Sequence, residues 1–558
     1  MKKIVVAAIL MAAGGITCWR SAAQASRTLS ELMPEGALLY LESPDFARLV
    51  REWNGSKVKR DWLASANYAA FSRSNLFAKL AGVYDEYGAA AGFGPNLDSV
   101  IEIAGDESAV ALYEIRDVEF LYISHVPQNR LAASQLWRVR DKFEQRQAAG
   151  IPFYIRTAGG RTIAFTFAND YLLLATRDDL MARALALLSG ARDPSVASSR
   201  WFERAVNAQP DGGELRLALN MDALLKSSYF RSHWIYRNAA QLRPYESGIV
   251  SVTRDPNQVL ENRIFLRHQD AAIEPAAADA RQDLAELLSS APASAGLVQA
   301  WAAPQADFVA AKIERKLLAP EPSGAVSFRY APQAIIRGEA GAESDLETRI
   351  DEPALPANSS GALVTGPLRN LLQAAQIRAM MQIQSAVAQP NGFVGTPCVL
   401  VVQARGDWDV SAVDQALARA IETLWTTSGL GARWVPGTAG AHAIERLDGL
   451  APLFVSARGH ILFLANDAGL LASVLDAPAP ARAGSASAVT YAAQFRHGVS
   501  RGPYRRLASA LDFGRCSPCF FSDNIASLSD TLSFVDSVDL AESDRGDAVV
   551  QRVTYRLR

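Results

Sequence analysis

The chain has 558 residues, of which 49% are hydrophobic and 20% are charged, and its formal net charge is −2. This composition is typical of a globular protein, and it excludes both the basic field that nucleic acid binding needs and the acidic excess of a solvating tail. The chain is too long for one hydrophobic core, so we expect more than one folding unit.

The first residues have the pattern of an export signal. A positively charged start is followed by a short apolar stretch, Ile4 to Thr17, and by the small-x-small sequence Ala23-Gln24-Ala25. This pattern predicts a signal peptide over residues 1–25 and cleavage before Ser26. We therefore expect an exported protein, either periplasmic or extracellular.

Two alternatives to simple cleavage stay open. The segment could remain as an uncleaved anchor, or a lipid could be attached at Cys18. Gly15-Ile16-Thr17, just before that cysteine, lack the leucine and the small residue that are usual at a lipidation site. No other stretch is long and apolar enough to predict a transmembrane segment in the mature chain.

Each half of the chain is expected to open with an apolar strand that leads into a helix. In the first half the strand covers 36–42, and Ser43-Pro44-Asp45 starts the helix, with proline in its first turn and a carboxylate near the positive end of the helix dipole. Two further strands, 109–115 and 119–126, flank Arg116-Asp117-Val118, which is typical of a hairpin turn.

A helix follows in both halves. Apolar residues at helical spacing predict it over 132–143 and over 413–424. The next regions, 154–185 and 444–475, are each predicted to contain three strands and a helix. Each half then closes with a strand, a helical stretch and a hairpin.

The second half repeats the first in the same order. The matches are Leu29-Ser30-Glu31-Leu32-Met33 with Leu284-Ala285-Glu286-Leu287-Leu288, Asp45-Phe46 with Asp307-Phe308, Leu172-Leu173-Leu174-Ala175 with Leu462-Phe463-Leu464-Ala465, and Arg263-Ile264-Phe265 with Arg552-Val553-Thr554. In the third match the offset is 462 − 172 = 290. A segment that occurs twice indicates one folding unit used twice.

The alternating patterns and short turns favour antiparallel pairing. We therefore predict an α+β fold, made of two tandem copies of a mainly antiparallel sheet domain with helices packed on one face. The first repeat domain is expected over 26–268, a linker over 269–283 and the second repeat domain over 284–558. The linker is rich in alanine and contains a proline, as domain boundaries often do.

Three cysteines remain after signal removal. Cys516 and Cys519, with Pro518 between them, have the spacing of thiol-disulfide oxidoreductases, but 511–515 is not the buried strand that precedes such a site. We interpret the pair as a possible disulfide that closes a loop in an oxidising compartment, and a redox role as the alternative. Cys398 lies in an apolar strand and is expected to be a buried free thiol.

Other motifs for chemistry are weak. Ser56-x-x-Lys59 has the spacing of penicillin-recognising enzymes, but no Lys-Thr-Gly sequence follows, and we interpret it as an exposed helix end. The six histidines form no His-x-x-x-His pair, and no phosphate-binding loop is present. The sequence therefore gives no reason to expect a metal or a cofactor.

One stretch, 229–237, interleaves aromatic and basic residues. Tyr229, Trp234 and Tyr236 are possible ligand contacts, because such side chains can stack on sugars. A helix with its aromatic residues in the core and its arginines at the rim explains the same pattern, and we favour that interpretation.

The segment Met33-Pro34-Glu35-Gly36-Ala37-Leu38-Leu39-Tyr40, followed by an Asp-led helix and preceded by an export signal, resembles a group of secreted bacterial proteins of unknown function. These proteins open with a Pro-x-x-x-Leu-Leu-Tyr strand. The resemblance implies export and no particular activity.

The positions that the two halves share are apolar, which indicates packing and not chemistry. We therefore expect a non-catalytic exported protein that binds an envelope protein or polymer, or supports an assembly there. An enzyme is the first alternative, either a thiol-disulfide oxidoreductase using Cys516 and Cys519 or a hydrolase with a dispersed site. A cell-wall or carbohydrate binder is the second.

Overall fold

The described residues of the computed structural model are 27–227, 242–318, 366–385, 397–425, 433–448, 452–477, 488–512, 527, 530 and 532–558. Their contacts divide the chain into two compact units, which we call the first and the second unit. The first unit comprises 1–52 and 80–227, and the second comprises 53–79 and 228–558.

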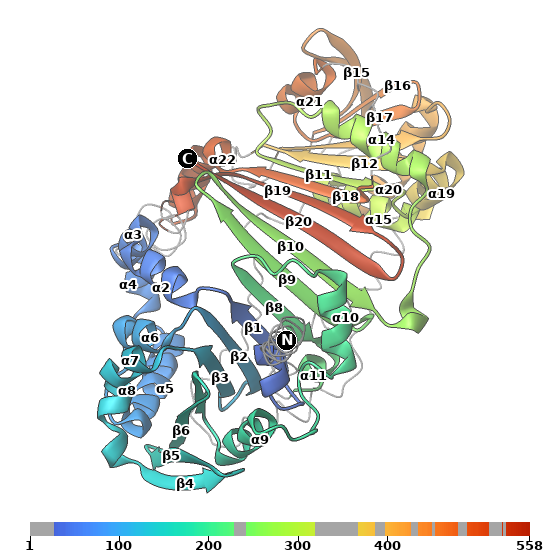
Figure 1. The fold of residues 1–558 in the computed structure, drawn as a ribbon. Helices are drawn as coiled ribbons and strands as arrows, with labels where there is room; N and C mark the ends of the chain where they lie inside the picture. Colours follow the sequence, from blue (N-terminus) through green and yellow to red (C-terminus); the bar gives the residue numbers. More distant parts are fainter. Residues whose placement is uncertain are drawn as a thin grey trace, which may run out of the picture. The chain divides into compact units, whose positions relative to one another are not determined.

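The first unit contains an eight-stranded antiparallel sheet (Figure 1). Its strands, in spatial order, are β4 (Glu144–Ala148), β5 (Ile151–Ala158), β6 (Arg161–Ala168), β7 (Tyr171–Ala175), β3 (Glu119–His125), β2 (Glu107–Glu114), β1 (Leu39–Ser43) and β8 (Leu215–Asn220). The predicted hairpin around Arg116-Asp117-Val118 is confirmed, because it joins β2 to β3, and Val118 has a φ of 54°.

The helices of the first unit are α2 (Phe46–Gly55), α5 (Asn75–Ala91), α6 (Leu97–Ile103), α7 (Gln128–Ala133), α8 (Gln135–Arg138), α9 (Asp178–Leu188), α10 (Arg200–Ala208) and α11 (Met221–Lys226), of which α2 and α5 extend into 53–79. The continuous helix predicted over 132–143 is wrong. Ser134 ends α7 and caps α8, because its Oγ accepts a hydrogen bond from the Trp137 N–H (3.2 Å). A short 3-10 turn then leads into β4.

The second unit contains a twelve-stranded antiparallel sheet. Its strands, in spatial order, are β14 (Arg433–Ala439), β15 (His442–Asp448), β16 (Leu453–Arg458), β17 (Ile461–Ala465), β13 (Cys398–Ala404), β12 (Ile377–Gln384), β11 (Leu297–Ala302), β18 (Tyr491–Arg496), β19 (Val535–Asp544), β20 (Ala548–Leu557), β10 (Gln258–Arg267) and β9 (Tyr245–Asp255). The hairpin β9–β10 thus pairs with β20, although the sequence places it before the predicted linker at 269–283. The domain boundaries predicted from the sequence, 26–268, 269–283 and 284–558, remain a prediction.

The helices of the second unit are α3 (Lys57–Leu63), α4 (Ala66–Phe71), α14 (Ala278–Ser289), α15 (Ala306–Ile313), α19 (Gly366–Ala375), α20 (Val410–Trp425), α21 (Ala468–Leu475) and α22 (His497–Leu511). The helix predicted over 413–424 is confirmed as α20. The α+β class and the antiparallel pairing are confirmed as well.

Helices cover both faces of each sheet, where we expected one. In β13, Leu400 and Val402 pack against α20, while Val399 and Val401 pack in a second core with α14 and α21. In β3, Leu121 and Ile123 pack against α9 and α10, while the opposite face packs beneath α7 and α8. A strand buried on both sides is apolar on both of its faces, and β13, in which every residue is buried, is apolar at every position except Gln403.

The first eight strands of the two sheets follow the same order. The order β4-β5-β6-β7-β3-β2-β1-β8 in the first unit becomes β14-β15-β16-β17-β13-β12-β11-β18 in the second, with each label raised by ten. Leu172 pairs with Ser124, and Leu462, at the offset of 290, pairs with Val402. These pairings match the paired positions of β7, β3, β2 and β1 with those of β17, β13, β12 and β11.

Burial on both faces predicts the effect of truncating neighbouring residues of β13. We expect Leu400→Ala to lower the free energy of unfolding by about 2–5 kcal/mol and Val401→Ala by about 1–3 kcal/mol, because each leaves a cavity in a different core. Leu63→Ala, at a position 42% exposed, is the control and should cost less than about 1 kcal/mol. Denaturant unfolding measures all three. A near-neutral Val401→Ala would mean that only one face is covered.

Candidate functional site

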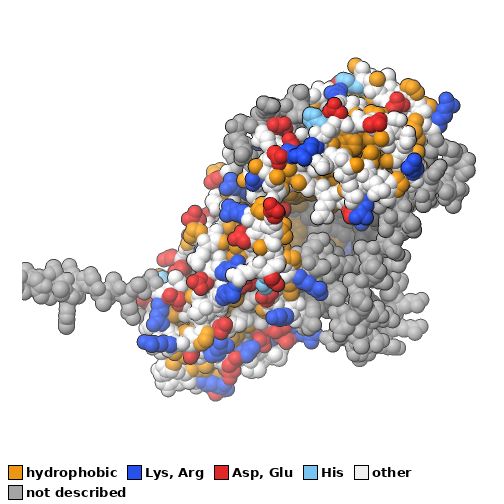
Figure 2. All heavy atoms as spheres, turned by 90° about the vertical axis from the view of Figure 1, so that its right-hand side faces the viewer, with side chains coloured by type: hydrophobic (Ala, Val, Ile, Leu, Met, Phe, Trp, Pro, Cys, Tyr) orange, Lys and Arg blue, Asp and Glu red, His pale blue; other side chains and the backbone are white. Residues whose placement is uncertain are grey.

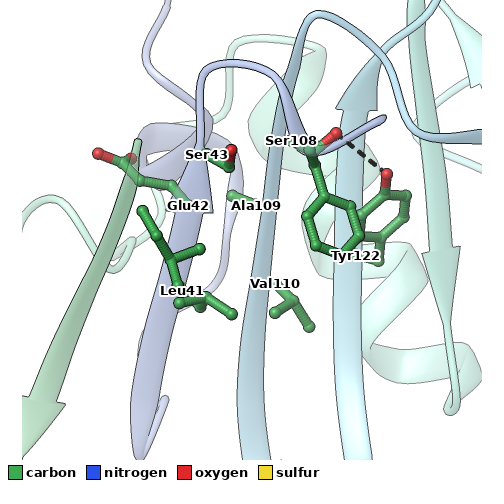
Figure 3. Close-up of a pocket in the computed structure, with 9 residues that line it drawn as sticks. Leu41, Glu42, Ser43, Ser108, Ala109, Val110 and Tyr122 are labelled. Carbon is green, nitrogen blue, oxygen red and sulfur yellow. Dashed lines mark hydrogen bonds between the residues drawn. The ribbon is translucent and has the colours of Figure 1, made fainter. Parts of the chain in front are cut away.

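The first unit has a small apolar hollow on one face of its sheet, across β8, β1, β2 and β3 (Figure 3). Its lining consists of Leu41, Glu42, Ser43, Phe46, Ser108, Ala109, Val110, Tyr122 and Leu215. The space inside is about 50 Å³. That is room for a water molecule or two, or for one small apolar group, and far below the roughly 300 Å³ of a typical small-molecule pocket.

Strand pairing brings these residues together from distant parts of the chain. Leu41 of β1 lies opposite Val110 of β2, and Ser43 lies opposite Ser108. Val110 in turn lies opposite Tyr122 of β3. Since side chains alternate between the faces of a strand, all five point to the same face.

The buried hydroxyl groups beside the hollow bind one another. Ser108 and Ser124 lie 2.8 Å apart, and the Tyr122 hydroxyl donates to Ser108 (3.1 Å), as Figure 3 shows. The backbone N–H of Gly105 donates to Ser124 Oγ (2.7 Å). A Cβ atom at residue 105 would lie 1.7 Å from the carbonyl oxygen of His125, so only glycine fits there.

The single carboxylate of the lining is also engaged within the protein. Glu42 forms an ion pair with Arg216 of β8, and it accepts a hydrogen bond from the buried Tyr40 hydroxyl (2.7 Å). Burial and the neighbouring Glu42 charge raise the pKa of Tyr40 well above its usual value. Tyr40 therefore stays protonated and donates to Glu42.

This arrangement does not activate a nucleophile. A serine nucleophile needs a base that takes its proton. The partners of Ser108 are two hydroxyls, and burial raises the pKa of one of them, Tyr122. The hollow offers apolar contact through Leu41, Val110 and their neighbours, and its polar groups are used by the fold.

The second unit holds different side chains at the same register positions. Stepping strand by strand from Leu172 and Leu462 matches the hollow residues Leu41, Ser43, Val110 and Leu215 to Gln299, Trp301, Gln382 and Tyr491. The sequence repeat adds Phe46 and Phe308 as a matched pair. We call the second set the glutamine–tryptophan cluster.

The side chains of the glutamine–tryptophan cluster contact one another. Gln382 Nε2 donates to Gln299 Oε1 (3.3 Å), and Gln299 Nε2 donates to the Tyr491 hydroxyl (2.9 Å). The Trp301 ring lies 5.4 Å from the Tyr491 ring and 5.3 Å from the Phe308 ring.

A lysine completes the cluster. The Lys312 ammonium lies 4.8 Å above the Trp301 ring, where the negative face of the indole attracts it. Burial, followed by the charge of Lys316, lowers the pKa of Lys312. The matched strand positions of the two units therefore carry different side chains.

A half-buried carboxylate in the second unit was not found from the sequence. Burial, followed by the charge of Glu445, raises the pKa of Asp414 on α20 to about 6. Its Oδ1 is buried without a hydrogen-bond partner, as is the indole Nε1 of Trp434. From the sequence, Asp414 reads as part of the polar face of α20, because nothing local shows that β15 brings a second carboxylate near it.

Several residues singled out from the sequence can be placed. Cys398 is a buried free thiol in β13, as predicted, and burial raises its pKa to about 12. Ser56 caps α3 by accepting a hydrogen bond from the Lys59 N–H (3.1 Å), which accounts for the Ser-x-x-Lys spacing.

The remaining predicted site residues lie outside the described residues. These are Tyr229, Trp234 and Tyr236, the cysteines Cys516 and Cys519, and Cys18. The hollow thus contains none of the residues that the sequence analysis named as candidate site residues.

The described part of the chain contains no group of three or more His, Cys, Asp and Glu residues placed to hold a metal ion. Within the same residues, no helix has both the length and the apolar character needed to cross a membrane. On the face drawn in Figure 2, acidic and basic side chains are interspersed.

Comparison with known proteins gives little. No protein family and no curated protein matches the sequence. Three solved structures, crystal forms I, III and IV of TP0453, are similar to part of it, at 14%, 12% and 13% identity. Each covers 44% of this chain and 81–83% of TP0453, with TM-scores of 0.25, 0.26 and 0.25.

The close approach at Gly105 predicts the effect of adding one methyl group. We expect Gly105→Ala to lower the free energy of unfolding by about 2–3 kcal/mol, because the new Cβ forces His125 and Ser124 away from residue 105. Gly94→Ala, at a position where a Cβ meets nothing, should stay within about 0.5 kcal/mol of the parent. Thermal and denaturant unfolding give both values. Equal stability of the two variants would rule out the contact.

The raised pKa of Asp414 predicts a pH dependence. Its folded pKa of about 6 exceeds the unfolded value, so the folded state binds more protons between about pH 4 and pH 6. The contribution of Asp414 to the free energy of unfolding therefore falls as the pH rises through that window, and it stays lower at higher pH. We expect Asp414→Asn to raise the melting temperature at pH 7.5 and to lose that advantage near pH 4.

Glu445→Gln is the matched control for this prediction. It removes the neighbouring charge but leaves the burial, so it should raise the melting temperature at pH 7.5 by less than Asp414→Asn does. Identical pH profiles for the parent and Asp414→Asn would contradict the assignment.

Proposed function

We propose that the protein is an exported, non-catalytic protein with a binding or scaffold role in the cell envelope. One observation carries the proposal. The hydroxyls and the carboxylate around the hollow are hydrogen-bonded or ion-paired within the protein, so the site offers shape and apolar surface instead of reactive groups. A hollow of about 50 Å³ suits one small apolar side chain of a protein partner better than a whole small molecule.

We further propose that the chain arose by duplication of one α+β module. Support comes from the shared strand order and from the offset of 290, which recurs in β7 with β17 and in the terminal hairpins. The glutamine–tryptophan cluster occupies in the second copy the place that the hollow occupies in the first. A catalytic site inherited through duplication would be expected to leave matching polar residues in one place or traces of them in the other, and here the matched residues differ in kind.

The export part of the proposal is tested by the mature N-terminus. Expression of the full chain in a bacterium with a periplasm, followed by osmotic release and intact mass measurement, should give a protein that starts at Ser26. Lys2→Glu combined with Lys3→Glu removes the charged start and should leave the full-length chain in the cytoplasm. A full-length product in the cytoplasm from the parent sequence would overturn the export proposal.

The non-catalytic part is tested on the purified mature protein with a fluorophosphonate probe, which labels activated serines. We expect no labelling, because the partners of Ser108 and Ser124 are not bases. Ser108→Ala and Ser124→Ala identify the serine if labelling does occur. Labelling that either variant abolishes would replace the binding proposal with a hydrolase.

A further inference from the structure

The two C-terminal hairpins have the same internal register. In the first, Ser251 of β9 pairs with Asn262 of β10. In the second, Ala541 of β19 pairs with Arg552 of β20. Both residues of the second pair lie 290 positions after those of the first (541 − 251 and 552 − 262). The repeat match of Arg263 with Arg552 is therefore wrong by one residue, because an odd offset would exchange the two faces of the strand.

The two hairpins meet through β10 and β20, which lie side by side in Figure 1. Asn262 lies opposite Arg552 in this ladder. Arg552 is the counterpart of Asn262 at the offset of 290. A residue that pairs with its own counterpart marks a local two-fold axis perpendicular to the sheet.

The pairs on either side of Asn262 obey the same symmetry. Leu260 pairs with Thr554, and Ile264 pairs with Val550. At the offset of 290, Leu260 corresponds to Val550 and Ile264 corresponds to Thr554, so the rotation exchanges the two pairs. The ends of the ladder, Gln258 with Arg556 and Leu266 with Ala548, are exchanged in the same way.

We infer that the β10–β20 ladder is an isologous interface, in which the last strand of each copy is a docking edge for a second copy of the same module. This inference rests on the proposed duplication. An antiparallel edge can accept a copy of itself, since the two-fold rotation keeps each side chain on its own face. Joining the two copies in one chain then covers both edges, which would otherwise be open to further pairing.

One end of the ladder departs from the two-fold symmetry. Arg267 forms a bidentate ion pair with Asp544 (2.7 Å for each bond), and its side chain is only 8% exposed. The counterparts at the offset of 290 are Leu557 and Arg254, which cannot form an ion pair. The chain leaving β10 also binds here, because the N–H of Ile273 donates to the carbonyl of Gly546 (3.1 Å).

The geometry of the ladder allows a test by disulfide trapping in the full chain. The Arg267 N–H donates to the carbonyl of Asp547, and the Leu557 N–H donates to that of Asn257, so odd-numbered residues of β10 hydrogen-bond to β20. The even-numbered pairs are therefore non-hydrogen-bonded, with Cα atoms about 4.5 Å apart, which a disulfide can bridge.

The experiment uses three cysteine pairs and one control. The pairs are Asn262→Cys with Arg552→Cys on the axis, and Leu260→Cys with Thr554→Cys and Ile264→Cys with Val550→Cys on either side of it. Each is combined with a site-specific protease sequence inserted between Ala276 and Ala277. The control pair is Asn262→Cys with Gln551→Cys, whose side chains lie on opposite faces.

After cutting, we expect each of the three pairs to keep both fragments in one band without reductant and to release them with reductant. The two flanking pairs should link to a similar extent, because the axis makes them equivalent. The control pair should not link. Flanking pairs of very different yield, or a control that links as well as the axis pair, would overturn the two-fold register.

The protein without added cysteines tests whether the β10–β20 interface holds the two fragments together after cleavage. Once cut at the inserted sequence, its two fragments should elute together from size-exclusion chromatography at micromolar concentration, with the mass of one 1:1 complex. Separate elution would overturn the docking inference. It would leave the export and fluorophosphonate results unaffected, so the failure of this inference and the failure of the proposed function are distinguishable.

Discussion

The structure depends on central strands that are buried on both faces and paired on both edges. In β13 every residue is buried, so no position can carry a charge without a partner. A shift by one residue would exchange the residues that face α20 with those that face α14, so the register is held by the packing of each set of side chains in its own core. The same requirement explains why the positions shared by β7 and β17 are apolar.

The same strand pairing can carry different side chains at positions outside the fully buried core. Leu41 and Val110 border a hollow in the first unit, while Gln299 and Gln382 at the matched positions form a hydrogen-bonded chain in the second. The strands remain the same in both cases, since the ladder hydrogen bonds involve only the backbone. The rings of Tyr491 and Phe308 pack against Trp301 in the second unit. The matched positions can therefore carry apolar side chains in one unit and hydrogen-bonding side chains in the other on the same order of strands.

The strands and their antiparallel pairing could be predicted because their signals are local. Alternation and turn residues identified the β2–β3 hairpin, and helical spacing identified α20. The break at Ser134 was missed, since a serine between apolar residues does not interrupt the spacing even when it caps a new helix. Helices on both faces were missed as well. A strand such as β13 is apolar at every position except Gln403, and its sequence does not show which elements cover each side.

The site could not be predicted for a different reason. Its residues are distant in sequence, and Leu41, Val110 and Leu215 have the character of ordinary core residues. Only the pairing of β1 with β2 and β8 shows that they share a face that is left partly open. The pKa of Asp414 is raised first by burial and then by the charge of Glu445, and neither the burial nor the approach of β15 is visible in the local sequence of α20.

The hairpins β9–β10 and β19–β20 show how the need to pair both edges of a strand acts on the joining of two hairpins. A strand at the edge of an antiparallel sheet presents unpaired backbone groups, and its own copy, turned by a two-fold rotation, is always a partner of matching spacing. Asn262 and Arg552 at the axis carry different side chains, so two like charges do not meet where a perfectly symmetric pair would place them. The ion pair of Arg267 with Asp544 is present at one end alone, and it favours the pairing of β10 with β20 over the pairing of either strand with a second copy of itself. Under the proposed duplication, an edge that would otherwise pair with other molecules becomes an internal ladder, and the differences between β10 and β20 make the pairing of one with the other specific.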